Sequence, residues 1–210
     1  NGARVCILRG EGKAFLAGAD IKEMVAFDGA RARDFAGLGQ GLFQRIEDSD
    51  VVSIAAIHGA CVGGGCELAL ACDIRIGAAG LQIGQPEVNI GLVPGFGGSQ
   101  RLPRVVGNGW ALRMILSGEP LNEQQALAAG LITEYGDSAD LPARVEKLAR
   151  TILSRGVQAM KIAKKLTRQA FDTPQKAGLE AERYAFGRTF DSGEAREGMN
   201  AFLEKRAPKF

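Results

Sequence analysis

Apolar and polar positions in the first 140 residues predict buried strands that alternate with amphipathic helices. Mostly apolar runs at residues 4–9 and 51–57 are typical of buried strands. Between them, a helix is expected from about residue 30 to 49. Its apolar face consists of side chains that recur at three and four residues, namely Phe35, Leu38, Leu42 and Ile46. Strand–helix alternation of this kind indicates an α/β core.

Capping residues and glycines place the other elements of this core. Asp20 followed by Glu23 matches a capping box, so a helix is expected to begin near Ile21. Pro86 makes a central strand over residues 82–91 unfavourable. The remaining expectations are short helices opened by glycine clusters at 63–65 and 95–98, strands at 73–76 and 131–134, a helix at 110–116, and a helix capped by Asn122 and Gln125.

From residue 141 onward the pattern is helical, with segments expected at 141–154, 157–171, 174–190 and 194–206. We therefore expect an α/β core over residues 1–140 and a C-terminal helical region over residues 141–210. Because the chain opens directly in a strand, we also expect further residues to precede it.

Charge and cysteine content narrow the function class. The net charge of +2 gives no strong electrostatic footprint for nucleic acid or a membrane surface. No apolar run approaches the ~20 residues of a transmembrane helix. The four cysteines form no CxxC pair, so we expect them to be reduced and buried, as in a cytosol-like compartment. With His58 as the only histidine, a zinc site or a Ser-His-Asp triad is unfavourable.

Two glutamates beside glycine-rich turns carry the candidate chemistry. Glu67 lies in the first turns of the helix after the glycine triplet, and Glu87 follows after that helix and a returning strand. That path is long enough to bring both carboxylates to one cavity. In a mostly apolar pocket they would have raised pKa values and transfer protons near neutral pH. On the residues alone, the alternative of helix-start or surface glutamates and plain glycine turns stays open.

A basic face is the second candidate feature. Lys161, Lys164, Lys165 and Arg168 recur at helical spacing. We interpret them as a solvated helix face; the alternative is a binding module for RNA or another polyanion, whose affinity would fall steeply with salt.

The sequence as a whole resembles the crotonase (enoyl-CoA hydratase/isomerase) family, and within it the short-chain enoyl-CoA hydratases. The matching segments follow the family's order: 14–24 (AFLAGADIKEM), 63–69 (GGGCELA), 84–87 (GQPE), 94–102 (PGFGGSQRL) and 197–206 (EGMNAFLEKR). The resemblance implies an α/β crotonase (ClpP-like) spiral of β-β-α units with a C-terminal helical region. The family's strands that precede residue 4 are missing from this sequence.

The resemblance also implies roles for individual residues. The backbone N–H groups of Ala17 and Gly64 would form an oxyanion hole for the thioester carbonyl. Glu87 would exchange a proton at Cα, Glu67 would orient or activate the water at Cβ, and the Gly95 amide would help to hold that water. Residues expected to bind substrate and coenzyme A are Ala17, Gly18, Ala19, Asp20, Ile21, Lys22, Gly64, Phe202 and Lys205.

The implied reaction is reversible syn hydration of a 2-trans-enoyl-CoA. Members that mainly move the double bond usually keep only the carboxylate corresponding to Glu87, so the presence of both glutamates favours hydration. The alternatives are enoyl-CoA isomerisation, thioester hydrolysis or decarboxylation, and a non-catalytic RNA-binding relative. No metal or redox cofactor is implied, because coenzyme A is part of the substrate.

The resemblance further implies a homotrimer, or a hexamer built as a dimer of trimers, in the cytoplasm, or in the mitochondrial matrix of a eukaryote. Apolar side chains in the tail agree with an oligomer, because they need a cover: Phe186, Phe190, Met199, Phe202 and Leu203.

Overall fold

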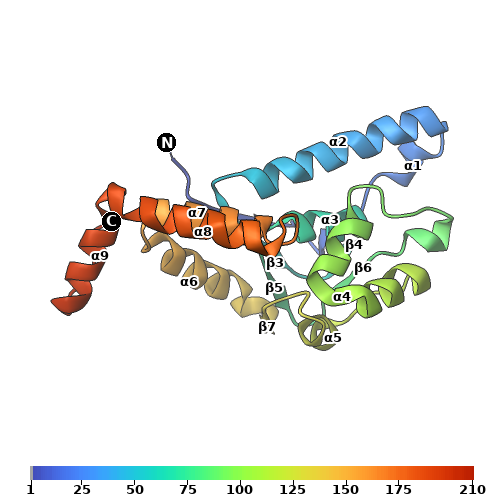
Figure 1. Ribbon diagram of the computed structural model, residues 1–210. Coiled ribbons are helices and arrows are strands. Elements are labelled where there is room, and N and C mark those ends of the chain that lie inside the picture. The colour runs from blue at the N-terminus through green and yellow to red at the C-terminus, as the bar shows by residue number, and fades with distance from the viewer. Residues whose placement is uncertain (1) are drawn as a thin grey trace. The chain divides into compact units, whose positions relative to one another are not determined.

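The computed structural model describes residues 2–210, which form two compact units. The core unit comprises residues 6–49 and 53–145, and the C-terminal unit comprises residues 2–5, 50–52 and 146–210. Figure 1 shows the helices and strands of each unit. The division expected at residues 140 and 141 stays a prediction.

Strands of the core unit alternate between two sheets along the chain (Figure 1). One sheet has the order β1-β3-β5-β7, formed by Val5–Arg9, Val52–Ile57, Ile74–Ala78 and Glu134–Gly136. The other has the order β2-β4-β6, formed by Ala14–Leu16, Ala60–Val62 and Gln82–Gly84. The pairs β3–β5, β5–β7, β2–β4 and β4–β6 are parallel. Each successive strand pair thus adds one strand to each sheet, which is the expected β-β-α spiral.

Helices follow the strand pairs. Those of the core unit are α1 (Ile21–Met24), α2 (Gly29–Asp48), α3 (Gly64–Ala71), the 3-10 helix η1 (Glu87–Ile90), α4 (Gly98–Ser117), α5 (Glu123–Ala128) and the 3-10 helix η2 (Ser138–Asp140). Helix α6 (Leu141–Leu153) follows η2. Fully buried side chains from strands and helices form the hydrophobic core, among them Ile57, Leu70, Leu81, Ile83, Leu102, Met114 and Leu131.

Local signals in the sequence account for several element boundaries. The Asp20 carboxylate accepts a hydrogen bond from the N–H of Lys22 and begins α1, although we expected the capping box with Glu23. Asn122 and Gln125 form a complete capping box at α5. Strand β3 is buried along its whole length, as predicted.

Other expectations were wrong in detail. Strand β1 is largely exposed rather than buried, and Cys6 on it is exposed, unlike the other three cysteines. The helix expected to end near residue 102 continues to a non-helical break at Gly107, where φ is 75°. The helix expected at 110–116 lies beyond this break, and both helices belong to α4. The strand expected at 131–134 lies at Glu134–Gly136.

The buried face of α2 also differs from the predicted one. Leu38 and Leu42 are 75% and 47% exposed, whereas Phe43 is buried. The ring of Phe96 packs against one face of α2, between the rings of Phe35 and Phe43. Gly39 lies between these two residues, four positions from each, and the Phe96 ring occupies the place that a Cβ at Gly39 would take. Because Gly39 is not a large apolar residue, the spacing of large apolar residues does not reveal this buried face of α2.

Helices of the C-terminal unit lie close to the predicted ranges. They are α7 (Val157–Gln169), α8 (Gln175–Thr189), the 3-10 helix η3 (Phe190–Ser192) and α9 (Glu194–Leu203). Helices α7 and α8 lie side by side (Figure 1). The Glu194 carboxylate accepts hydrogen bonds from the N–H groups of Val157 and Gln158 at the start of α7.

Two members of the basic face on α7 have protein partners. Lys161 forms an ion pair of 3.0 Å with Asp50, and the Lys164 Nζ donates to the carbonyl oxygen of Val51 at 2.8 Å. These contacts agree with a structural use of that face.

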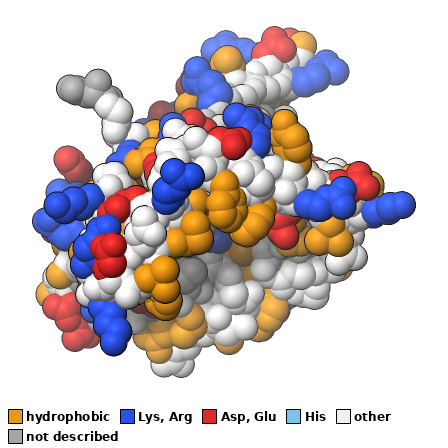
Figure 2. All heavy atoms as spheres, turned by 60° about the vertical axis from the view of Figure 1, so that its left-hand side comes forward, with side chains coloured by type: hydrophobic (Ala, Val, Ile, Leu, Met, Phe, Trp, Pro, Cys, Tyr) orange, Lys and Arg blue, Asp and Glu red, His pale blue; other side chains and the backbone are white. Residues whose placement is uncertain are grey.

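Large apolar side chains remain exposed in this unit, including Phe186 (67%), Phe202 (82%) and Leu203 (76%). In Figure 2, hydrophobic side chains gather at the surface between charged ones. No helix within residues 2–210 is long and apolar enough to cross a membrane.

Candidate active site

The end of β2 lies directly against the start of α3. A Cβ at Gly65 would overlap the carbonyl oxygen of Leu16, so only glycine fits there. A Cβ at Gly18 would lie 3.9 Å from the Gly64 nitrogen, and a Cβ at Gly64 would lie 3.7 Å from the Ala19 nitrogen. The segment from Ala17 to Ala19 therefore lies beside the N-terminus of α3.

This contact brings together the two amides expected to form an oxyanion hole. Gly64 is the first residue of α3, so its N–H has no acceptor within the helix. Ala17 directly follows β2, and no turn or loop hydrogen bond from either N–H is found within residues 2–210. The role of these two amides as an oxyanion hole stays a prediction.

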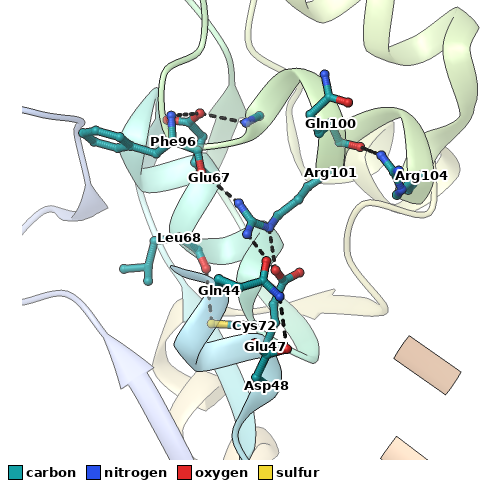
Figure 3. Close-up of polar contacts among 11 residues, drawn as sticks. Gln44, Glu47, Asp48, Glu67, Leu68, Cys72, Phe96, Gln100, Arg101 and Arg104 are labelled. Carbon is teal, nitrogen blue, oxygen red and sulfur yellow. Dashed lines mark hydrogen bonds and ion pairs between the residues drawn. The ribbon is translucent and has the colours of Figure 1, made fainter. Parts of the chain in front are cut away.

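Glu67 is buried, with 1% of its surface exposed, and its carboxylate reaches the N-terminus of α4. Its Oε1 accepts hydrogen bonds from the N–H groups of Phe96 at 2.7 Å and Gly98 at 2.8 Å (Figure 3). Free amides at the start of a long helix favour a bound anion. Burial raises the pKa of the Glu67 carboxyl, while these two N–H groups and the Arg101 charge oppose the rise.

Glu87 is the first residue of η1, and its carboxylate points to the glycine triplet. Its Oε1 lies 3.4 Å from the position that a Cβ would take at Gly63. In the orientation that satisfies both groups, the buried Gln85 amide nitrogen donates to the two Glu87 oxygens at 2.8 and 3.1 Å. Burial, with the neighbouring Glu67 charge adding to it, raises the pKa of Glu87 to about 7. The Glu87 carboxylate thus lies at the glycine triplet before α3 and the Glu67 carboxylate at the glycine-rich turn before α4, in unlike environments.

Helix α2 holds the turn that binds Glu67. The Gln40 Nε2 donates to the Gly95 carbonyl oxygen at 2.8 Å, and the rings of Phe35 and Phe43 lie 5.3 and 5.8 Å from the ring of Phe96. The Phe96 ring also lies 3.3 Å from the position of a Cβ at Gly64. The walls of the site on this side are therefore aromatic.

Sequence reasoning assigned a water-binding role to the Gly95 amide and missed the amides of Phe96 and Gly98. A usable signal was present, because a glycine-rich turn followed by a long helix is a common anion site. The water-binding role of Gly95 stays a prediction.

Other expected binding residues are spread along the chain. Asp20 caps α1, where Ile21 is 53% exposed and Lys22 is also exposed. Phe202 lies on α9 and Lys205 just after it, both exposed in the C-terminal unit. Their contacts with coenzyme A stay predictions.

Two further expectations concern His58 and metals. The His58 Nε2 lies 3.2 Å from the Gly12 carbonyl oxygen, so the ring contacts the backbone of the turn before β2. Within residues 2–210, no group of three or more His, Cys, Asp or Glu side chains is placed to hold a metal ion. That the protein uses no cofactor stays a prediction.

The chain is similar to a known protein family over its whole length. The enoyl-CoA hydratase/isomerase family model matches residues 1–210. The chain is 42% identical to crotonyl-CoA hydratase of Syntrophomonas wolfei over 97% of this chain and 79% of the relative, and 43% identical to a probable enoyl-CoA hydratase of Bacillus subtilis over 100% and 82%.

A solved structure, Pseudomonas aeruginosa DspI, superimposes with a TM-score of 0.94 at 42% identity, over 98% of this chain and 79% of that one. The similarity confirms the expected α/β spiral fold.

Proposed function

Because the chain belongs to the enoyl-CoA hydratase/isomerase family, we propose that it catalyses the reversible syn addition of water to a 2-trans-enoyl-CoA, giving the 3-hydroxyacyl thioester. The observation that carries the proposal is that the Glu67 carboxylate, at the turn before α4, is close enough to the Glu87 carboxylate, at the turn before α3, for its charge to raise the Glu87 pKa. Hydration requires one group that activates water and one that delivers a proton, and these two carboxylates have the environments for that division.

The amides of Ala17 and Gly64 bind the thioester oxygen in this proposal. They stabilise the negative charge that develops there as water adds to the double bond, and one such donor contributes roughly 3 kcal/mol. Their fixed backbone positions need no rearrangement during the reaction.

The two glutamates divide the proton transfers. The N–H groups of Phe96 and Gly98 fix the Glu67 Oε1 and favour its charged form against the effect of burial, so in this proposal Glu67 takes a proton from the water that attacks Cβ. Glu87, with a pKa of about 7, carries a proton in a large fraction of molecules near neutral pH and delivers it to Cα. No electron transfer occurs, so the proposed reaction needs no redox cofactor.

Substrate binding and assembly are part of the same proposal. Residues 17–22 would line the path of coenzyme A, with Phe202 and Lys205 as further contacts. The exposed apolar side chains on α8 and α9 support a homotrimer or a dimer of trimers. A cytoplasmic location agrees with the free cysteines.

A panel of 2-trans-enoyl-CoA thioesters of increasing chain length tests the proposal. The protein should remove the conjugated absorbance of at least one of them, with the 3-hydroxyacyl product identified by mass spectrometry. Turnover of a 3-enoyl thioester into a conjugated product, without hydration, would indicate an isomerase. Release of free thiol would indicate hydrolysis, and binding of RNA without turnover would favour the non-catalytic alternative.

A further inference from the structure

Arg101 joins the turn that holds Glu67 to helix α2. Its Nη1 donates to the Phe96 carbonyl oxygen at 2.8 Å, and its Nε and Nη2 donate to the Glu47 Oε2 at 2.9 and 2.7 Å. The Arg101 and Glu47 side chains are only 13% and 15% exposed. Figure 3 shows the guanidinium between the turn and Glu47.

The hydrogen bond from Arg101 to the Phe96 carbonyl oxygen fixes the peptide unit that joins the two amides bound to Glu67. Glu67 accepts from the N–H groups of Phe96 and Gly98, and the Phe96 carbonyl belongs to the peptide unit between those two amides. Gly97, with φ of 110°, leaves the backbone there little intrinsic preference. A Cβ at Gly97 would overlap the Arg101 Nη1, so the guanidinium packs directly on this glycine.

We propose that Arg101, oriented by Glu47, is a positioning residue that fixes residues 95–98 and thereby the direction in which the Glu67 carboxylate faces the reacting water. The inference rests on the proposed function, in which Glu67 activates that water. Since Arg101 bonds to the backbone and not to Glu67 itself, it acts through the turn.

The charged and titratable groups around Glu67 predict a specific pH signature. Arg101 faces it from α4, Glu87 from η1 and the Cys66 thiol from the same helix, while Glu47 of α2 lies behind Arg101. The Arg101 charge lowers the pKa of Glu67, so its loss raises that pKa. A base must be ionised to act, and the acidic limb of the kcat/KM profile should therefore move to higher pH.

The experiment compares Arg101→Met with a matched control, Arg104→Met. Arg104 lies one turn further along α4 and donates to the Gln100 carbonyl oxygen at 2.8 Å, away from residues 95–98 (Figure 3). Arg101→Met should lower kcat by about ten- to a hundredfold, because small misplacements of a reacting group have effects of this size. Its KM should stay near that of the wild type, and Arg104→Met should leave kcat and KM unchanged.

Two further variants separate positioning from folding. Arg101→Lys keeps the charge without the forked donors and should recover only part of kcat while restoring the acidic limb. If Arg101→Met fails to fold because the largely buried Glu47 loses its arginine partner, the double variant Glu47→Gln/Arg101→Met removes the Glu47 charge and is used for the same kinetic comparison.

A readout that does not need turnover accompanies the kinetics. Carboxyl ¹³C NMR of labelled glutamate, with the Glu67 signal assigned by its loss in Glu67→Gln, should show a higher pKa in Arg101→Met than in the wild type. If a folded Arg101→Met keeps kcat, the acidic limb and the Glu67 pKa, the positioning role is wrong. If the wild type hydrates no thioester but the NMR shift occurs, the proposed function fails and the link between Arg101 and Glu67 survives.

Discussion

At the scale of single residues, Glu67 and Glu87 differ in the groups that stabilise or destabilise their ionised carboxylates. Glu67 accepts hydrogen bonds from two backbone N–H groups and lies near the Arg101 guanidinium. Glu87 accepts hydrogen bonds from the Gln85 amide nitrogen and lies close to the Glu67 charge. Like charges in a poorly solvated site do not ionise together easily. Burial raises the pKa of both carboxyls, that of Glu87 to about 7. The N–H groups and the guanidinium beside Glu67 favour its charged form, so Glu67 suits the role of base and Glu87 that of proton donor.

Replacing Glu87 by Gln tests the proton-transfer role. The amide preserves the shape of the side chain but has no proton to exchange, so kcat should fall by about 10²–10⁴-fold. Binding of a non-reacting acyl-CoA, measured by calorimetry, should be nearly unchanged, and the exposed Glu119→Gln should behave as the wild type. Full activity in Glu87→Gln would remove Glu87 from the mechanism.

The same substitution has a predictable effect on stability. The folded pKa of about 7 lies above the ordinary value of 4.5, so the folded state binds the proton more tightly. Ionisation of Glu87 therefore lowers the free energy of unfolding. This loss is absent below about pH 4.5, grows as the pH rises towards 7 and is complete above it. Since water partly screens this side chain, we expect Glu87→Gln to stabilise the fold by about 1–2 kcal/mol at pH 8. Urea unfolding at pH 4.5 and 8 should show the gain only at the higher pH.

At the scale of elements, α2 determines the shape of the turn that binds Glu67. Gln40 and Glu47 contact the turn or its arginine, and the bare backbone at Gly39 accepts the Phe96 ring. The three residues lie on the face of the helix that also carries Phe43. Helix α2 therefore supports the site without supplying a reacting group.

Glycine-to-alanine changes along α2 should have opposite signs. A Cβ at Gly39 would overlap the Phe96 ring, so Gly39→Ala should destabilise the protein by about 1–3 kcal/mol and lower kcat as the ring is displaced. Gly41, two residues on, has open space around it, and Gly41→Ala should stabilise the helix by about 0.5–1 kcal/mol. Thermal unfolding of both variants checks the signs. Two equal shifts would contradict the close packing at Gly39.

Elements with strong periodicity and clear caps were predictable from the sequence. The helices from residue 141 onward and the buried strand β3 agree with the pattern, because each depends on local signals. The buried face of α2 was not predictable, because it is set by Phe96, which is more than 50 residues away along the chain. The amides that bind Glu67 were missed because the glycine-rich turn signals an anion site before α4 but does not show which distant carboxylate its N–H groups bind.

At the scale of the whole molecule, the C-terminal unit exposes more large apolar surface than its own packing explains. Phe186 and Phe190 form an edge-on pair with 67% and 50% of their surfaces exposed, and Phe202 is 82% exposed. Exposed aromatic groups in such number are typical of a surface that a partner covers. Such a surface supports the proposed assembly from copies of one chain.

Light scattering after size exclusion should give a mass that is a multiple of the 22.2 kDa of one chain. Phe186→Asp should reduce that mass, because a charge would be buried at a contact between copies. Lys176→Asp introduces the same acid at an exposed position on the same helix and should not. A wild-type protein that runs as a single chain at all concentrations would contradict the proposed assembly.

The close approach of β2 to α3 at Gly65 has a consequence for mutational maps. Every other amino acid would place an atom inside the peptide of Leu16, whatever its chemistry. A saturation library scored by growth should therefore show residue 65 as intolerant as the two glutamates. If positions were ranked only by their tolerance to substitution, residue 65 would be mistaken for a catalytic residue, although its only contribution is the absence of a side chain.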